Sequence, residues 1–351
     1  MSVCLLRNYC WAAVWGLMAL AGMMSRDAYG EQWTGEVITL EPHHGQVHVP
    51  VVTALAIHPQ GRYLALGGDD HFVRIWDLNQ RKQVRVLEGH TDWVRTVSFS
   101  PSGDLLVTSG NDHRVVVWST QTGEKLREYS QLSHVVTRVV FSGDSQLVAV
   151  VGFGNKLRII DGTTGDRLRE YDCPCVDMRT VAFSPDDRTI VGGGRNGRIR
   201  IWDSANGTQL TEFNAHSQRV RDLAFSADGE LLATCGEDRK VVISRSNGEQ
   251  AYELPRQGAK VMTLAFCGPD QLATAGSDNV VRIWDLKTRA ESAALNGHTG
   301  TVAVLAYRDN LLVSTGYDTT VRTWIRQAHL TSGDSGTPPR VGVKPLSLDA
   351  R

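Results

Sequence analysis

One residue position recurs through this chain at an almost constant interval, and this recurrence constrains the fold more than any other feature. The first four intervals are 42 residues long and the last two are 40. The seven positions are Trp76, Trp118, Ile160, Trp202, Ser244, Trp284 and Trp324. Self-similarity at this period indicates an array of small units, each of which needs its neighbours to bury its apolar face.

The residues around each position predict short β-strands. An aspartate stands six residues before four of the tryptophans, at Asp70, Asp112, Asp278 and Asp318, and β-branched residues fill much of the interval. Further upstream, turn sequences such as residues 100–103 (Ser-Pro-Ser-Gly) separate more apolar runs. Proline presets one turn dihedral and glycine accepts a left-handed one, so these segments favour hairpins. Each unit therefore predicts four short antiparallel strands.

Four strands per unit, Gly-His pairs such as Gly89-His90 and Trp-Asp pairs such as Trp76-Asp77 make residues 34–326 resemble the WD-repeat (WD40) family. The resemblance implies an all-β fold, a seven-bladed β-propeller of four-stranded antiparallel blades. No convincing fourth strand follows Trp324, whereas residues 35–40 resemble a strand without a blade. The resemblance therefore implies that this N-terminal strand pairs with the last blade and closes the ring.

In WD40 proteins, one histidine, one hydroxyl residue, the turn aspartate and the tryptophan of a blade form a hydrogen-bonded network. The resemblance implies complete networks in the second and seventh blades: His90, Thr108, Asp112 and Trp118, and His298, Ser314, Asp318 and Trp324. It implies partial networks in three other blades. The first blade has His48, Asp70 and Trp76, with Leu66 at the hydroxyl position, and the fifth has His216, Thr234 and Asp238. The sixth has Thr274, Asp278 and Trp284, with Gly258 replacing histidine. The fourth blade keeps Trp202 and has Asn196 for the aspartate, and the third has lost the set, with Leu132, Val150, Gly154 and Ile160.

These His-Ser-Asp sets also resemble a hydrolase triad. They recur once per blade, however, and a fully satisfied buried polar network stiffens a core. Nucleophile activation needs one exposed site with an oxyanion hole, not several copies inside the walls. The structural interpretation is therefore favoured, and no catalytic residue is assigned.

Composition narrows the function classes. The 351-residue chain has a formal net charge of −1, which argues against nucleic-acid binding driven by bulk electrostatics. It contains no glycine-rich phosphate loop after a strand and no metal-spaced Cys/His set, so no cofactor and no metal are predicted. It also lacks Cys-x-x-Cys-His, which argues against covalent haem.

Both ends of the chain differ from the repeats. Residues 10–24 are apolar, and Ala28 and Gly30 are small residues of the kind that a signal peptidase requires. Residues 1–30 therefore predict a signal peptide cleaved near Gly30, with an uncleaved membrane anchor over residues 8–25 as the alternative. Membrane attachment is expected only in that second case. The chain is predicted to be of the bacterial exported type, periplasmic or secreted, and residues 329–351 are expected to form a disordered tail.

The predicted export affects the chemistry expected of the cysteines, because the compartment would be oxidising. Cys173 and Cys175 flank a proline at the turn where the fourth blade would carry its Gly-His pair, and in an oxidising compartment they could form a small disulfide or bind a soft metal. Cys235 is expected to be buried and Cys267 to be an unpaired thiol. A metal site at His43, His44 and His48 is a further alternative, but His48 is already assigned to the first blade's network.

The resemblance also identifies the exposed positions of the upper face. They are the third and fifth residues after each Gly-His histidine and the residue before the turn aspartate. The fifth positions are Thr53, Arg95, Thr137, Arg179, Arg221, Thr263 and Ala303. From the three sets, the candidate partner-binding residues are Trp93, Arg95, Asn111, Phe153, Asp177, Arg179, Arg195, Arg219, Arg221, Glu237 and Tyr317. Arginines beside exposed aromatic residues have the composition of interface hot spots.

The sequence thus predicts a non-catalytic scaffold that binds other proteins through an arginine and aromatic sector on blades two to five. Because arginine pairs with carboxylates in a bidentate manner, an acidic partner is preferred. The alternative is an exported enzyme, or a small-ligand or metal binder, that uses the central channel. Its candidate residues are Asp69, His71, Asp177 and Glu237, whose spacing matches no recognisable mechanism.

Overall fold

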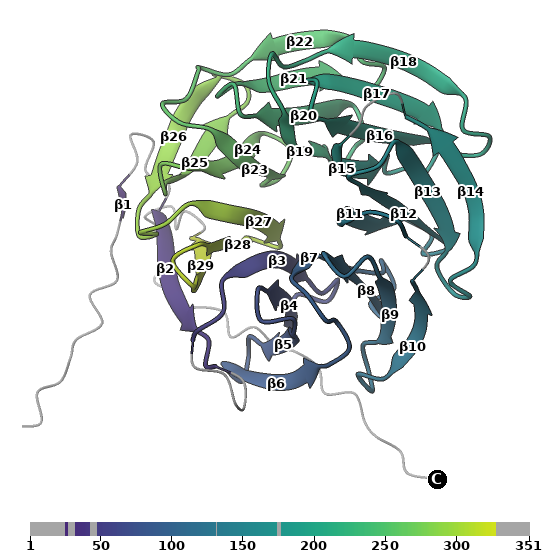
Figure 1. Cartoon of the computed structure of the whole chain (residues 1–351). Helices are drawn as coiled ribbons and strands as arrows, with labels where there is room; N and C mark the ends of the chain where they lie inside the picture. Colours follow the sequence, from purple (N-terminus) through teal and green to yellow (C-terminus); the bar gives the residue numbers. More distant parts are fainter. Residues whose placement is uncertain (1–24, 27–31, 43–47, 131, 174–176, 328–351) are drawn as a thin grey trace, which may run out of the picture.

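The computed structural model places seven antiparallel β-sheets side by side around a central axis (Figure 1). It describes residues 25–26, 32–42, 48–130, 132–173 and 177–327. Six sheets have four strands and the seventh has five, and these ranges contain no helix. The predicted seven-bladed β-propeller is confirmed. The anchor range 8–25, apart from Ser25, and the tail 329–351 lie outside the described residues.

Each blade runs outward in chain order, starting from the strand that lines the channel. The innermost strands are β3 (Val52–Ile57), β7 (Val94–Phe99), β11 (Val136–Phe141), β15 (Met178–Phe183), β19 (Val220–Phe225), β23 (Val261–Phe266) and β27 (Val302–Arg308). The second strands are β4 (Tyr63–Gly68), β8 (Leu105–Gly110), β12 (Leu147–Gly152), β16 (Thr189–Gly194), β20 (Leu231–Gly236), β24 (Gln271–Gly276) and β28 (Leu311–Gly316).

The third strands carry the recurring tryptophan position: β5 (Val73–Asp77), β9 (Val115–Ser119), β13 (Lys156–Asp161), β17 (Arg198–Asp203), β21 (Val241–Arg245), β25 (Val281–Asp285) and β29 (Thr320–Arg326). The outer strands of blades one to six are β6 (Lys82–Leu87), β10 (Lys125–Tyr129), β14 (Arg167–Asp172), β18 (Gln209–Asn214), β22 (Gln250–Glu253) and β26 (Ala290–Leu295).

The seventh blade takes its outer strand from the beginning of the chain. Strand β2 (Gln32–Thr39) pairs antiparallel with β29, with Thr39 opposite Thr320 and Gly35 opposite Trp324. Glycine is needed at position 35, because a Cβ there would lie 2.8 Å from the Trp324 ring. The predicted closure of the ring by an N-terminal strand is therefore confirmed.

A short strand, β1 (Ser25–Arg26), extends this sheet beyond β2. Its two residues pair with Trp33 and Gln32. They belong to the segment predicted to be a signal peptide, so cleavage near Gly30 would remove β1 and leave β2 in place. Removal of β1 would therefore not open the ring.

The apolar core lies between the blades. The second strands are almost wholly buried, and apolar side chains of one blade pack against those of the next. Val73 and Ile75 of the first blade, for example, share a cluster with Val94, Phe99 and Trp118 of the second. Because each unit buries its apolar face only against its neighbours, the ring must be complete to be stable.

A network of hydrogen bonds connects the strands of the second blade. His90 contacts Asp112 through Nδ1 at 2.7 Å and Thr108 through Nε2 at 2.7 Å. The indole Nε1 of Trp118 donates to the same Thr108 hydroxyl at 2.8 Å. Every member of this buried set has a partner, which is the condition under which a polar network stabilises a core.

The seventh and fifth blades repeat this arrangement. In the seventh, His298 lies 2.9 Å from Asp318 and 2.7 Å from Ser314, which also accepts from Trp324. In the fifth, His216 lies 2.9 Å from Asp238 and 3.0 Å from Thr234. There Ser244 replaces the tryptophan, and its buried hydroxyl has no hydrogen-bond partner.

The first blade departs from the expected network. His48 is exposed and lies 3.9 Å from Asp69, whereas the buried Asp70 pairs with the buried guanidinium of Arg74 at 2.5 Å. The assignment of His48 to this network was wrong. Leu66 offers no hydroxyl to hold an imidazole, and Arg74 supplies the cation that the buried carboxylate needs.

The third and sixth blades show two further solutions. In the third, Leu132, Val150 and Ile160 are buried in one apolar cluster, so packing replaces the polar network. In the sixth, Gln257 donates to Thr274 at 3.0 Å. Sequence reasoning missed Gln257 because it aligned Gly258 with the histidine. Its distance of 17 residues from Thr274 lies between the 18 residues of His90–Thr108 and the 16 of His298–Ser314.

We expect removal of residues 1–40 to abolish cooperative unfolding of the whole ring, because β29 then loses its partner along its full length. Removal of residues 1–30 alone should leave the thermal midpoint within a few degrees of the full chain, since β2 remains. Circular dichroism melts of the two truncated proteins compare them directly. Equal midpoints for both would show that the strand is dispensable.

Asp238 of the fifth blade should make the free energy of unfolding depend on pH. Burial would raise the pKa of Asp238, but the hydrogen bond from His216 and those from the Ser217 and Lys240 amides lower it to about 2. This pKa is below the ordinary value of 3.8, so the stabilisation is present above about pH 4 and is lost as the pH falls toward 2. Asp238→Asn should lower the free energy of unfolding by about 2 kcal/mol at pH 7 and flatten its decline between pH 4 and 2.

Urea unfolding at each pH measures both effects. Asp309→Asn, at a residue whose side chain is 81% exposed, is the matched control. Parallel acid-side profiles for wild type and Asp238→Asn would contradict this role of the carboxylate.

Candidate functional site

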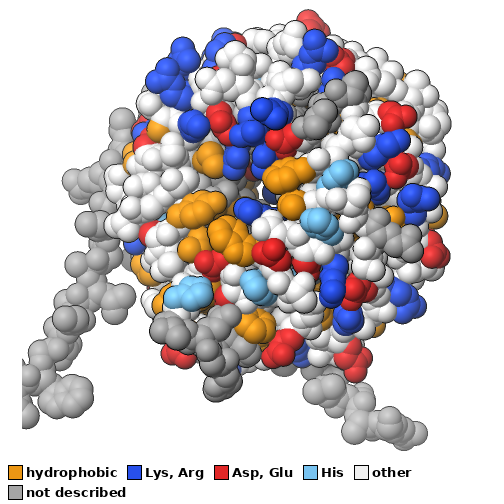
Figure 2. All heavy atoms as spheres, in the orientation of Figure 1, with side chains coloured by type: hydrophobic (Ala, Val, Ile, Leu, Met, Phe, Trp, Pro, Cys, Tyr) orange, Lys and Arg blue, Asp and Glu red, His pale blue; other side chains and the backbone are white. Residues whose placement is uncertain are grey.

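All seven fifth positions predicted from the sequence meet at one mouth of the central channel. They line a single cavity of about 120 Å³ together with Arg138, Phe153, Asp222, Met262, Val304 and Tyr317. Figure 2 shows Lys and Arg side chains gathered beside the central opening, next to carboxylates, with hydrophobic side chains on its rim. We call this cavity the mouth pocket.

On the second blade, three of the predicted residues form one unit. The Arg95 guanidinium lies over the Trp93 ring, with its central carbon 4.8 Å from the ring centroid. Its Nε donates to the Asn111 side-chain oxygen at 2.9 Å. These contacts hold Arg95 in place without cancelling its charge, because both partners are neutral.

Between the third and fourth blades, Arg179 lies over Phe153 at 4.3 Å from the ring centroid. It also contacts Asp177 at 2.6 Å. Asp177 has a φ of 128°, which is costly for a residue with a side chain. Phe153 itself is 38% exposed, so an apolar surface borders the guanidinium.

Charged pairs continue from the fourth blade to the sixth. Arg219 bridges Asp177 at 3.5 Å and Glu237 at 3.0 Å. Glu237 also contacts Arg221 at 3.6 Å and Lys260 at 3.2 Å. The Arg219 and Lys260 interactions hold the pKa of Glu237 below its ordinary value, against the effect of burial, which would raise it. Glu237 therefore remains a carboxylate at neutral pH and shares its charge among three cations.

The arginines are crowded as well as paired. Burial lowers the pKa of Arg179, Asp177 opposes that effect, and the neighbouring Arg219 and Arg221 lower the pKa further. The Nε atoms of Arg219 and Arg221 are buried without a hydrogen-bond partner. This cluster of cations therefore retains unused hydrogen-bond donors.

The remaining predicted residues lie apart from this cluster or at its edge. Arg195 is exposed, and Tyr317 is 46% exposed on the wall of the mouth pocket. Asp69, a candidate for a ligand site in the channel, instead accepts a hydrogen bond from the Val51 amide at 2.9 Å. Asp177 and Glu237 are brought together only through Arg219.

Within the described ranges, no group of three or more His, Cys, Asp or Glu side chains could hold a metal ion. His43 and His44 lie outside those ranges, as does Cys175. Cys173 is disulfide-bonded. Cys235 and Cys267, the free thiols within the described part of the chain, are buried. Burial raises the pKa of Cys267 to about 12 and that of Cys235 well above its ordinary value, so neither is a nucleophile at neutral pH.

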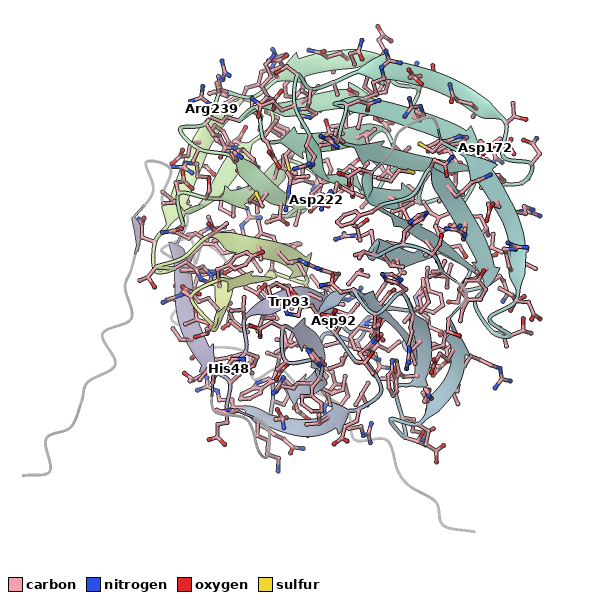
Figure 3. All side chains as sticks on the ribbon, in the orientation of Figure 1. His48, Asp92, Trp93, Asp172, Asp222 and Arg239 are labelled. Atoms are coloured by element: carbon pink, nitrogen blue, oxygen red, sulfur yellow. The ribbon has the colours of Figure 1, made fainter. Side chains whose placement is uncertain are left out.

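Sequence reasoning missed the two charged residues that follow fifth positions, Arg138 and Asp222. Asp222 is buried on β19 and accepts hydrogen bonds from the Thr263 hydroxyl at 3.0 Å and the Leu264 amide at 3.3 Å. Arg138 lies 3.7 Å from its carboxylate across the channel. Figure 3 shows Asp222 and Trp93 near the central opening, whereas His48 lies farther out.

Asp222 belongs to a series of side-chain hydrogen bonds between innermost strands. Thr53 donates to Val94 O, Thr96 accepts from Val139 N, Thr137 donates to Met178 O, Thr180 donates to Asp222, Asp222 accepts from Thr263, and Thr263 accepts from Leu305 N. These bonds join blades one through seven at six successive junctions. The mouth pocket therefore lies on a scaffold whose blades are fixed relative to one another.

Among the described residues, no helix is long and apolar enough to cross a membrane. This finding does not bear on the predicted anchor, whose range is almost wholly outside them.

Comparison with protein families gives one description. A model described as WD domain, G-beta repeat matches residues 36–77, 81–119, 165–203, 207–243, 248–285 and 290–324, which is more than half of the chain. Residues 120–164, which include the first three strands of blade three, lie between two of these matches. This is the blade in which apolar packing replaces the polar network.

Three curated proteins match short stretches of the chain. Mitochondrial division protein 1 of Mycosarcoma maydis is 34% identical over 79 residues, 22% of this chain and 10% of that protein. General transcriptional corepressor TUP1 of Saccharomyces cerevisiae is 41% identical over 39 residues, 11% and 6%. Probable serine/threonine-protein kinase PkwA of Thermomonospora curvata is 45% identical over 42 residues, 12% and 6%. The chain thus matches a tenth or less of the length of these three relatives.

We expect Asp222→Ala to lower the free energy of unfolding by about 3 kcal/mol, because the Leu264 amide and Arg138 lose a buried acceptor. Asp222→Asn keeps one acceptor oxygen and should cost less. Chemical denaturation of both variants measures the difference. A loss below about 0.5 kcal/mol for Asp222→Ala, the range of ordinary surface substitutions, would contradict a role in joining the blades.

Proposed function

The chain belongs to the WD40-repeat family, and from this premise we propose that it is a non-catalytic platform for protein–protein assembly outside the cytoplasm. WD40 propellers are a common protein-interaction scaffold. The partner-binding surface in this proposal is the arginine and aromatic sector of the upper face, on blades two to five. The partner is a protein with an acidic surface.

One observation carries the proposal: arginines and partly exposed aromatic side chains are held against one another around the mouth pocket. Arg95 lies over Trp93, and Arg179 lies over Phe153. Large rigid aromatic surface and directional guanidinium donors are the features of interface hot spots. Because the contacts between these side chains preorganise them, less conformational entropy would be lost on binding.

The relatives support a scaffold in a different way. Their names describe mitochondrial division, transcriptional corepression and protein kinase activity, and each shares only one or two repeat lengths with this chain. Repeats of this kind that occur in proteins of such different names are better suited to forming a surface than to performing one chemical reaction. No nucleic-acid partner is proposed, since the net charge is only −1.

Use of the channel for catalysis or for a large ligand has less support. The mouth pocket measures about 120 Å³, whereas small-molecule sites usually measure ~300–1,000 Å³. Asp222, the one carboxylate among the described residues that line it, is engaged by the Thr263 hydroxyl and the Leu264 amide. A general acid–base pair is therefore not assembled there.

Export follows from the apolar segment before the propeller and the small residues near Gly30. Fractionation of cells expressing the full chain, with N-terminal sequencing of the product, tests this part. A mature protein beginning near Glu31 in the extracytoplasmic fraction is expected. An intact protein confined to the cytoplasm would overturn the location.

The binding face is tested by affinity capture from the cell envelope, with wild type beside a variant that replaces Arg179, Arg195, Arg219 and Arg221 with glutamate. We expect the glutamate variant to capture at least tenfold less of a partner that wild type captures, because attractive charge pairs at the interface become repulsive. A matched variant reverses four exposed arginines that do not line the mouth pocket and lie on third strands, outer strands and turns: Arg127, Arg188, Arg245 and Arg289.

Melting temperatures must match for all three proteins before capture is compared. Loss of the partner in the first variant alone supports the proposed face. Equal capture by both variants would place the interface elsewhere, and absence of any captured protein would contradict the scaffold itself.

A further inference from the structure

The mouth pocket carries an excess of positive charge. The described residues of its lining include four arginines, at positions 95, 138, 179 and 221, and one carboxylate, Asp222, so together they have a net charge of +3. The whole chain has a net charge of −1. Charge of one sign in a small recess with low-dielectric walls concentrates the field at its opening.

Internal pairing leaves much of this charge available. Asp222 is occupied by Thr263 and Leu264, and Arg138 approaches it only to 3.7 Å. Arg95 bonds to a neutral amide oxygen. Arg221 lies 3.6 Å from Glu237, a carboxylate that it shares with Arg219 and Lys260. Arg179 lies 2.6 Å from Asp177, which it shares with Arg219, so these four cations share only two carboxylates.

The volume of the mouth pocket limits which ligand group it can hold. A volume of about 120 Å³ accommodates a few heavy atoms, because one water molecule occupies ~30 Å³ in the liquid. It therefore suits one short side chain better than a cofactor. Phe153 and Tyr317 line the same pocket and are partly exposed, so they offer apolar surface to the methylene groups of that side chain.

We propose that the mouth pocket binds a single carboxylate, supplied by a glutamate or aspartate side chain on an extended segment of the protein partner. The carboxylate pairs with Arg221 and Arg179, and the methylene groups of the side chain pack on Phe153. Binding relieves the mutual repulsion of these arginines by adding a carboxylate to the two, Asp177 and Glu237, that they already share with Arg219. This inference rests on the proposed scaffold function and names the chemistry of its anchor.

The probe is the capped amino acid N-acetyl-glutamate N-methylamide, and its neutral isostere N-acetyl-glutamine N-methylamide is the control. Side-chain Nε–H signals of Arg179 and Arg221 report binding in ¹H–¹⁵N NMR spectra, since these nitrogens are buried. Saturable shifts of both signals are expected with the glutamate probe. The glutamine probe should leave them in place at the same concentration and ionic strength.

Two variants test the assignment without large packing changes. Arg221→Gln should weaken binding of the glutamate probe by about tenfold, the usual consequence of losing one charge-assisted pair. Arg245→Gln, at an exposed site on the third strand of blade five, should not change it. Equal binding by the two variants, or equal shifts from both probes, would overturn the proposal.

Two further ligands distinguish other anion sources. Inorganic phosphate that binds more tightly than the glutamate probe would point to a free-anion site and overturn the peptide assignment. Binding of N-acetylglycine that is tighter than binding of the glutamate probe would indicate a site for the terminal carboxylate of a chain. It would overturn the assignment to a side chain.

Failure of this inference differs from failure of the scaffold. A partner captured by wild type, with no response to the glutamate probe, overturns the inference alone. Probe binding with no captured partner leaves the carboxylate site standing and overturns the scaffold.

Discussion

The pairing of β2 with β29 is the contact on which the rest of the structure depends. Every blade buries its apolar side chains against the next, so a ring left open at one seam would expose two apolar faces and one unpaired strand edge. Seven residue pairs join the first described long strand to the last one and remove that edge. The mouth pocket exists only because this closure brings blades one to seven around a common axis.

Two kinds of polar contact stabilise the closed ring, one within blades and one between them. Within blades, His-Asp-Thr or His-Asp-Ser networks tie strands together, most completely in blades two and seven. Between blades, threonines and Asp222 link successive innermost strands around the channel. The first kind is replaceable: blade one uses a buried Asp70–Arg74 pair, and blade three uses apolar packing. What the site requires is the closed ring and not a particular network.

The proposed function follows from a different use of the same repeat. A position that recurs every 40 to 42 residues brings seven side chains to one channel mouth, where three blades contribute arginine and the others contribute threonine or alanine. The arginines therefore form a charged sector on an otherwise neutral ring. A carboxylate that enters the mouth pocket would meet these cations on the wall formed by blades four and five, which explains why a small recess could orient a larger partner.

The sequence by itself determined an array of seven equivalent units of short strands, because in-register positions of a repeat must occupy equivalent places in space. Through its resemblance to WD40 proteins it also indicated the closed ring, the closing strand and the residues at the channel mouth. It could not determine contacts across the channel or between neighbouring blades. The pairing of Asp177 and Glu237 through Arg219, the approach of Arg138 to Asp222 and the use of Gln257 beside Thr274 depend on side-chain reach and blade spacing. The error at His48 has the same origin: sequence register placed it beside Asp70, but a buried carboxylate is stabilised by the nearest cation that can be buried with it, and only the tertiary structure shows that this is Arg74.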